Sequence, residues 1–209
     1  MGISLSIFQL IVIYPSSCLV SALDTLATQS FEYKNYKDLV SYLYISIIVS
    51  VSVDFFFSII FYFSPLYLHL FDNDHKILAL TIPYLNMLIP LIFLNSGKII
   101  IKSFFNAQLV FFSTTIFTVI QNIMALFTCY LFVYYFELGY FGYIYSMYIC
   151  DTLFLILSLS YMIFSNKFNY LTFHIELCNK SLWIEFILIS IPSFILSIFE
   201  YSGFYLLFL

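Results

Sequence analysis

Three acidic side chains stand inside long apolar segments of this 209-residue chain, namely Asp54, Asp151 and Glu200. An acidic group at membrane depth is costly, so it is a functional candidate unless another side chain pairs with it. A medium of low dielectric constant disfavours the ionised carboxylate, so such a group holds a proton at rest and loses it when a cation or water arrives. These residues therefore predict a carboxyl group that exchanges a proton for a cation.

Glu200 has the most informative neighbours of the three. Pro192, eight residues earlier, removes a backbone hydrogen bond and bends or loosens a helix. Such a bend lets the carboxyl group face a cavity rather than lipid. Tyr201, Phe204 and Tyr205 follow it, and aromatic faces attract organic cations. The alternative for these rings is ordinary lipid-facing bulk, since 22% of the chain is aromatic.

The remaining polar residues of interest have simpler interpretations. For Asp54 and Asp151, the alternative to a functional role is a hydrogen bond, made in the neutral form, to a Ser, Thr or Tyr on another helix. Asp24 and Gln29 are expected to cap a helix end and to hold the loop that follows.

The amino-acid composition indicates whether water or lipid surrounds these acidic side chains. The chain is 63% hydrophobic and only 9% charged, whereas a soluble domain carries about 25% charged residues. Its mean hydropathy is +1.04. A soluble fold of this length could not keep so much apolar surface from water. The sequence therefore predicts an integral, multi-pass membrane protein whose main partner is the lipid bilayer.

Six apolar segments follow one another, each bounded by polar residues or turn signals. They span residues 2–22, 39–64, 77–101, 109–136, 139–164 and 182–209. Each is long enough for a membrane helix, which needs about 20 residues, and barrel strands would be about half as long. The prediction is an all-α integral membrane protein, a single transmembrane domain over 1–209. The alternative for residues 1–22 is a signal peptide, although the usual positive start is missing.

Lysine placement predicts the orientation of the helices, because loops on the cytoplasmic side accumulate basic residues. Six crossings put all lysines but Lys76 on the side of the loop that holds Lys34 and Lys37. That side is predicted to be cytoplasmic.

Several other functions are disfavoured by the same sequence. The net charge is −4 and no arginine is present, so we expect no nucleic-acid binding. The pair Asp72 and Asp74 resembles a metal-binding DxD sequence of membrane transferases, but there is no second acidic motif and no arginine to hold a phosphate. The histidines and cysteines lack the spacing of metal ligands. We therefore expect neither an enzyme nor a bound metal or cofactor.

The polar stretch of residues 21–36, SALDTLATQSFEYKNY, resembles the end of the second helix in the multidrug and toxic compound extrusion (MATE) family, in its eukaryotic form. That pattern reads ALDTLCGQAFGAGNY. The family's glycines are not kept here, because Thr28 replaces one of them and Glu32 and Lys34 fall in the FGAG region.

Further matches to this family come in the family's order along the chain. The matching residues are Asp74, Tyr84, Leu85, Ile89, Pro90, Asn106, Ala107, Gln108, Asn122, Leu138, Gly139, Gly142, Ile191, Pro192, Ser193 and Glu200. The family often carries a second glutamate where this chain has Tyr205, which puts the range of substrates in doubt.

The resemblance implies a two-lobed transporter that exports organic cations, drugs or other xenobiotics by proton-coupled antiport. The chain covers the family's second to seventh transmembrane helices, so it would form a partial bundle: most of the N-terminal lobe and the first helix of the C-terminal lobe. The implied substrate- or proton-binding residues are Glu200, Tyr201, Tyr205, Gln29 and Asn122.

Two functional readings stay open. In the first, the chain transports, with another chain supplying the missing helices. In the second, it is a truncated or remnant fragment without transport of its own. The sequence does not distinguish the plasma membrane from a vacuolar or other endomembrane.

Overall fold

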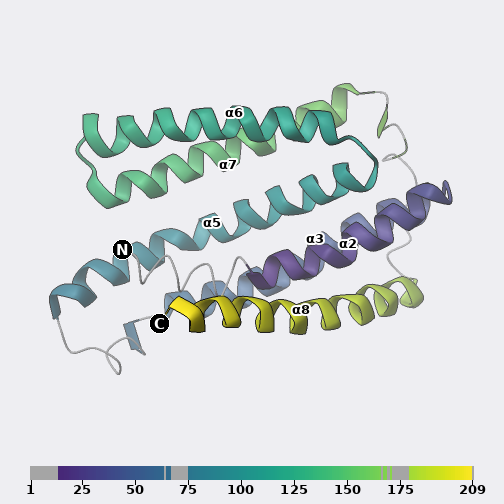
Figure 1. Ribbon diagram of the computed structural model, residues 1–209, viewed down its shortest axis with the longest axis horizontal. Coiled ribbons are helices and arrows are strands. Elements are labelled where there is room, and N and C mark those ends of the chain that lie inside the picture. Colours follow the sequence, from purple (N-terminus) through teal and green to yellow (C-terminus); the bar gives the residue numbers. More distant parts are fainter. Residues whose placement is uncertain are drawn as a thin grey trace.

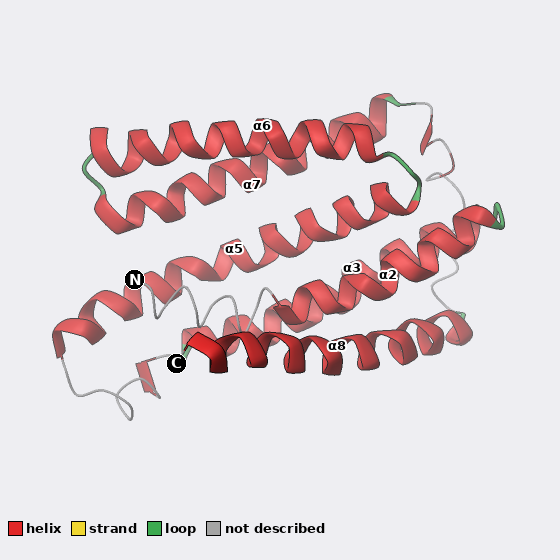
Figure 2. Cartoon of the chain, in the orientation of Figure 1, coloured by secondary structure: helices red, strands yellow, loops and turns green. Residues whose placement is uncertain are grey.

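The computed structural model describes residues 14–63, 65–66, 75–165, 167–168, 170 and 179–208. Long helices make up almost all of this part of the chain, and none of these residues lies in a strand (Figure 2). The helices are α2 (Tyr14–Glu32), α3 (Tyr36–Tyr62), α5 (His75–Ala107), α6 (Phe111–Tyr130), α7 (Gly139–Phe164) and α8 (Lys180–Phe208). A π-helical turn, η2 (Leu131–Tyr135), continues α6. The predicted all-α class is confirmed.

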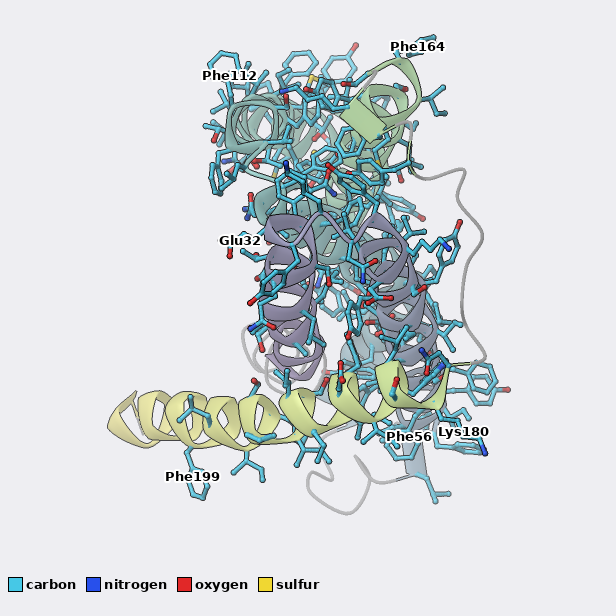
Figure 3. All side chains as sticks on the ribbon, turned by 90° about the vertical axis from the view of Figure 1, so that its right-hand side faces the viewer. Glu32, Phe56, Phe112, Phe164, Lys180 and Phe199 are labelled. Atoms are coloured by element: carbon cyan, nitrogen blue, oxygen red, sulfur yellow. The ribbon has the colours of Figure 1, made fainter. Side chains whose placement is uncertain are left out.

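The helix α5 lies in the middle of the bundle (Figure 1). On one side of it are α2 and α3, which contact each other and α8, and on the other side are α6 and α7. Figure 3 shows α8 running across the bundle at an angle to α2 and α3, from Lys180 to Phe199, with its later part extending beyond the other helices. The bundle therefore consists of two layers joined by one long central helix.

Two apolar cores hold these helices together. The larger core joins α2, α3, α5 and α8 through buried residues such as Leu23, Leu39, Phe104 and Phe186. The smaller core lies between α3, α5 and α7 and includes Tyr84. Burial of one large apolar side chain contributes about 1.5–3 kcal/mol in water, whereas in lipid the contribution comes from close packing.

Large apolar side chains also cover the outside of the bundle, as expected where lipid is the solvent. On α6, for example, Phe112 and Leu126 are each more than three-quarters exposed. Four helices within the described part are long and apolar enough to cross a membrane: Tyr36–Tyr62, Thr81–Ala107, Phe111–Tyr135 and Gly139–Phe164.

The first half of α8 is attached to α2 and α3. Leu182 and Phe186 are buried in the larger core. The Tyr42 hydroxyl of α3 donates a hydrogen bond of 2.6 Å to Oε2 of Glu185. Farther along α8, Phe199 is 70% exposed.

The connections that carry lysines lie together. The turns after α2 and after α5, and the start of α8, are all at the right-hand end in Figure 1. At this end Tyr170 stacks on Tyr36, with ring centroids 4.9 Å apart, and its hydroxyl donates to Oε1 of Gln108. Burial raises the pKa of Tyr170 above its ordinary value. The assignment of this end to the cytoplasm stays a prediction.

The helix α2 differs from the predicted segment, because it continues ten residues past Ala22 to Glu32. The reason is the regular spacing of apolar residues along this stretch. Ala22, Leu23, Leu26 and Ala27 are buried, while Thr25 and Gln29 are exposed. This spacing is that of an amphipathic helix. The sequence prediction ended this segment at residue 22, whereas the turn consists only of residues 33–35.

We expect Leu109→Gly to stabilise the protein by about 1 kcal/mol. Leu109 adopts a φ of 60° in the turn after α5, where a side chain crowds the backbone. The N–H of Val110 closes this turn on the carbonyl of Phe105 at 3.0 Å. Thermal unfolding in detergent, followed by circular dichroism, measures the change. The control is Leu126→Gly, at an exposed position inside α6, where glycine should cost about 1 kcal/mol. A loss of stability in both variants would contradict the prediction.

Candidate functional site

A buried ion pair joins α5 to α7. The Nζ atom of Lys98 lies 2.7 Å from Oδ1 of Asp151, and the side chains are 22% and 4% exposed. From α6, Nε2 of Gln121 donates to the same oxygen, also at 2.7 Å. Three helices therefore meet at one carboxylate.

The ion pair corrects the sequence interpretation of Asp151, which had offered a Ser, Thr or Tyr hydroxyl on another helix as its partner. In the structure the partners of Asp151 are Lys98 and Gln121. Gly97, beside Lys98 on α5, faces Leu155 of α7, and a Cβ atom at Gly97 would make only ordinary contact with that side chain.

A cavity of about 380 Å³ opens beside the ion pair, between α5, α6 and α7. We call it the polar cavity. Its polar lining consists of Lys98, Lys102, Thr118, Gln121, Asn122 and Asp151. The sequence had singled out Asn122, which lies on the exposed side of α6 and on the wall of this cavity. The structure thus groups Asn122 with Asp151, a link that the sequence did not predict.

Asp54 occupies a second polar position, between α3 and α5. It is fully buried, and the Ser96 hydroxyl donates to its Oδ1 at 2.9 Å. Ser50, one turn earlier on α3, lines the same pocket of about 210 Å³. The expected hydroxyl partner on a neighbouring helix is confirmed here.

Asp24 does not cap a helix end, so that prediction was wrong. It lies eight residues before the end of α2, and its Oδ1 accepts a hydrogen bond from Ser103 on α5. It therefore ties α2 to α5. Gln29, one of the predicted site residues, is exposed on α2.

The remaining predicted site residues lie on α8. Glu200, Tyr201 and Tyr205 belong to this helix, and their side chains are outside the described part of the structure. Pro192 lies within α8, eight residues before Glu200. Near the proline, the Ser193 hydroxyl donates to the carbonyl of Ile189 at 3.0 Å.

The sequence analysis missed Lys98, Gln121 and Ser103 as members of polar clusters. A signal was present for Lys98, because it falls inside the predicted segment 77–101. A lysine within an apolar helix requires an acidic partner. No comparable signal identifies Gln121 or Ser103 without knowledge of how the helices pack.

Comparison with known proteins relates this helix bundle to a protein family and to a solved structure. The model of the MatE family matches residues 1–131. The crystal structure of the eukaryotic MATE transporter AtDTX14 superimposes with a TM-score of 0.87 and 23% sequence identity. The match covers 99% of this chain and 46% of that one, so the chain spans about half of the transporter's length. A search of curated proteins found no match. The family match covers more than half of the chain, which therefore belongs to the MatE family of integral, multi-pass membrane transporters.

Proposed function

We propose that the chain is part of a proton-coupled antiporter that exports small organic compounds, organic cations among them. The match to the MatE family over residues 1–131 carries the proposal. The buried acids support it, because ionisable groups inside membrane helices mark ion and proton pathways. Asp54 and Asp151 both lie between helices rather than toward lipid.

Glu200 is the proposed exchange group. It follows Pro192 on α8, and a proline frees a backbone carbonyl and loosens the helix around it. In the proposed cycle the Glu200 carboxyl group holds either a proton or the cationic substrate. Tyr201 and Tyr205 supply aromatic faces to that cation, and Gln29 on α2 and Asn122 in the polar cavity supply polar contacts at other points on the path of the substrate.

Replacing Glu200 with glutamine is expected to reduce proton-driven uptake of a fluorescent organic cation about tenfold or more, because glutamine cannot exchange a proton. Uptake is measured in vesicles that contain the purified chain and carry an imposed pH gradient. The matched control is Glu137→Gln, which removes one exposed carboxylate from the turn before α7. Equal uptake by the Glu200 variant and the parent protein would remove Glu200 from the mechanism.

The second candidate is a helix bundle that transports nothing on its own. The same vesicle assay separates the two candidates. Absence of uptake by protein that unfolds cooperatively on heating would support the second one, and uptake restored by a co-expressed partner chain would support an assembly.

A further inference from the structure

We propose that the polar cavity between α5, α6 and α7 binds an anionic group, a phosphate or a carboxylate. This inference goes beyond the proposed function, which places a cation at Glu200. It rests on the charges, hydrogen-bond donors and position of the cavity.

The charges that line the cavity do not balance. Lys98 and Lys102 contribute two ammonium groups, and Asp151 contributes one carboxylate. Lys98 is paired with Asp151 at 2.7 Å, whereas Lys102 forms no ion pair with any residue in the described ranges. The cavity therefore carries one positive charge in excess.

The two lysines stand on one face of α5, four residues apart. Like charges at this spacing repel each other on a helix. An anion between the two ammonium groups would replace this repulsion with two attractions. Lys98 retains donors for such an anion, because an ammonium group has three protons and the bond to Asp151 uses one.

The uncharged part of the lining adds further donors. Asn122 carries an amide at the cavity wall, and Gln121 has a second amide proton beyond the one it gives to Asp151. A cation would find a poorer site. The Asp151 carboxylate is 4% exposed, and its Oδ1 already accepts two hydrogen bonds.

The position of the cavity suggests two sources for the anion. Lys102 lies five residues before the end of α5, a rise of about 8 Å, at the end of the bundle that carries the lysine-bearing connections. Basic pockets between membrane helices near such an end bind anionic lipid headgroups. The volume of about 380 Å³ also falls within the usual range for small soluble ligands. Both anionic lipid headgroups and small soluble ligands can carry phosphate or carboxylate groups.

The test measures binding to the purified full chain in a non-ionic detergent. Inorganic phosphate and succinate represent soluble anions, short-chain phosphatidylglycerol represents the headgroup, and short-chain phosphatidylcholine is the neutral control. Calorimetric titration gives the affinity, and thermal unfolding reports stabilisation by a bound ligand. We expect saturable binding of at least one anionic probe and a higher melting temperature in its presence.

Lys102→Gln is the main variant, because Lys102 is exposed and its loss leaves the Lys98–Asp151 pair intact. It should weaken anion binding about tenfold, the loss of one charge-assisted contact. Lys180→Gln, which removes an exposed lysine from the start of α8, should leave the affinity unchanged. Asn122→Ala, on the opposite wall, should weaken binding by a smaller factor.

Binding of phosphatidylglycerol alone would support the proposal and identify a lipid, and binding of phosphate or succinate would support it and identify a soluble anion. Three results would overturn it: no binding of any anionic probe, equal loss of affinity in the Lys102 and Lys180 variants, or stabilisation by organic cations only. The assay requires no transport, so its result is independent of the Glu200 test.

Discussion

Replacing Asp151 with leucine is expected to lower the free energy of unfolding by about 3–5 kcal/mol, because the ammonium group of Lys98 loses its partner within the membrane helices. Leucine has the same number and branching of side-chain heavy atoms as aspartate, and the polar cavity beside this position has room for its larger methyl groups, so little of the loss should come from packing. The Gln121 amide also loses its acceptor. Unfolding in mixed micelles, followed by circular dichroism, measures the change.

A double-mutant cycle shows whether the loss comes from the orphaned charge. Lys98→Met alone should cost less than Asp151→Leu, since the Asp151 carboxyl group would keep its hydrogen bond from Gln121. The double variant with both changes should return to within about 1 kcal/mol of the parent, as for other buried pairs replaced by apolar residues. If the two single losses simply add, the pair is not energetically coupled. Glu137→Gln, at an exposed position, should change stability by less than about 0.5 kcal/mol.

The second large effect is expected at Gly142, where α7 contacts the π-helical turn. An added Cβ atom would lie 2.7 Å from the carbonyl oxygen of Phe132 and 3.0 Å from the backbone nitrogen of Val133. Backbone atoms cannot rotate away as a side chain does, so α7 and η2 must separate. Gly142→Ala should therefore cost about 2–3 kcal/mol, in the range of overpacked cores. Thermal unfolding in detergent measures it.

Gly97→Ala is the matched control for Gly142→Ala. A Cβ atom at Gly97 would lie 3.6 Å from a methyl carbon of Leu155, which is ordinary contact. Because alanine favours a helix over glycine by about 1 kcal/mol, this variant should be neutral or more stable. Equal losses in the two variants would show that the close backbone approach at Gly142 is not the cause.

Gly142 and Gly139 also explain, in physical terms, the LGxxG pattern that Leu138, Gly139 and Gly142 form among the matches to the family. Gly139 has a φ of 56°, a conformation that other residues adopt at a cost, and this conformation lets the chain turn from η2 into α7. Gly142 then allows the two helices to touch. The pattern thus specifies both the turn from η2 into α7 and the contact between these two helices.

The fold class followed from segment length and apolar content, because crossing a bilayer imposes both. The residues at which the helices end did not follow from segment length and apolar content. The extension of α2 to Glu32 depended on the 3.6-residue spacing of Leu23, Leu26 and Ala27, which is masked by the polar composition of the stretch. A bilayer constrains the interior of a helix strongly and its ends weakly.

The candidate site was predictable in its residue types and not in its partners. An acid in an apolar segment needs a partner, and the expected partner was a Ser, Thr or Tyr hydroxyl on another helix. Asp54 has such a partner in Ser96. Asp151 instead pairs with Lys98, which lies 53 positions earlier in the sequence. Only the packing of α5 against α7 brings the two together. Glu200 and its tyrosines stay a prediction.

The attachment of α8 along one half has a mechanical consequence. Phe186 is fixed in the larger core, and Phe199, 70% exposed, lies 13 residues farther on, about 20 Å along the axis. A helix held in this way is a lever arm whose fulcrum is its anchored half. A rotation of about 15° at the fulcrum would carry the far end through about 5 Å, the rise of one helical turn. A rotation of only about 3° where Tyr42 meets Glu185 would move the far end of α8 by about 1 Å.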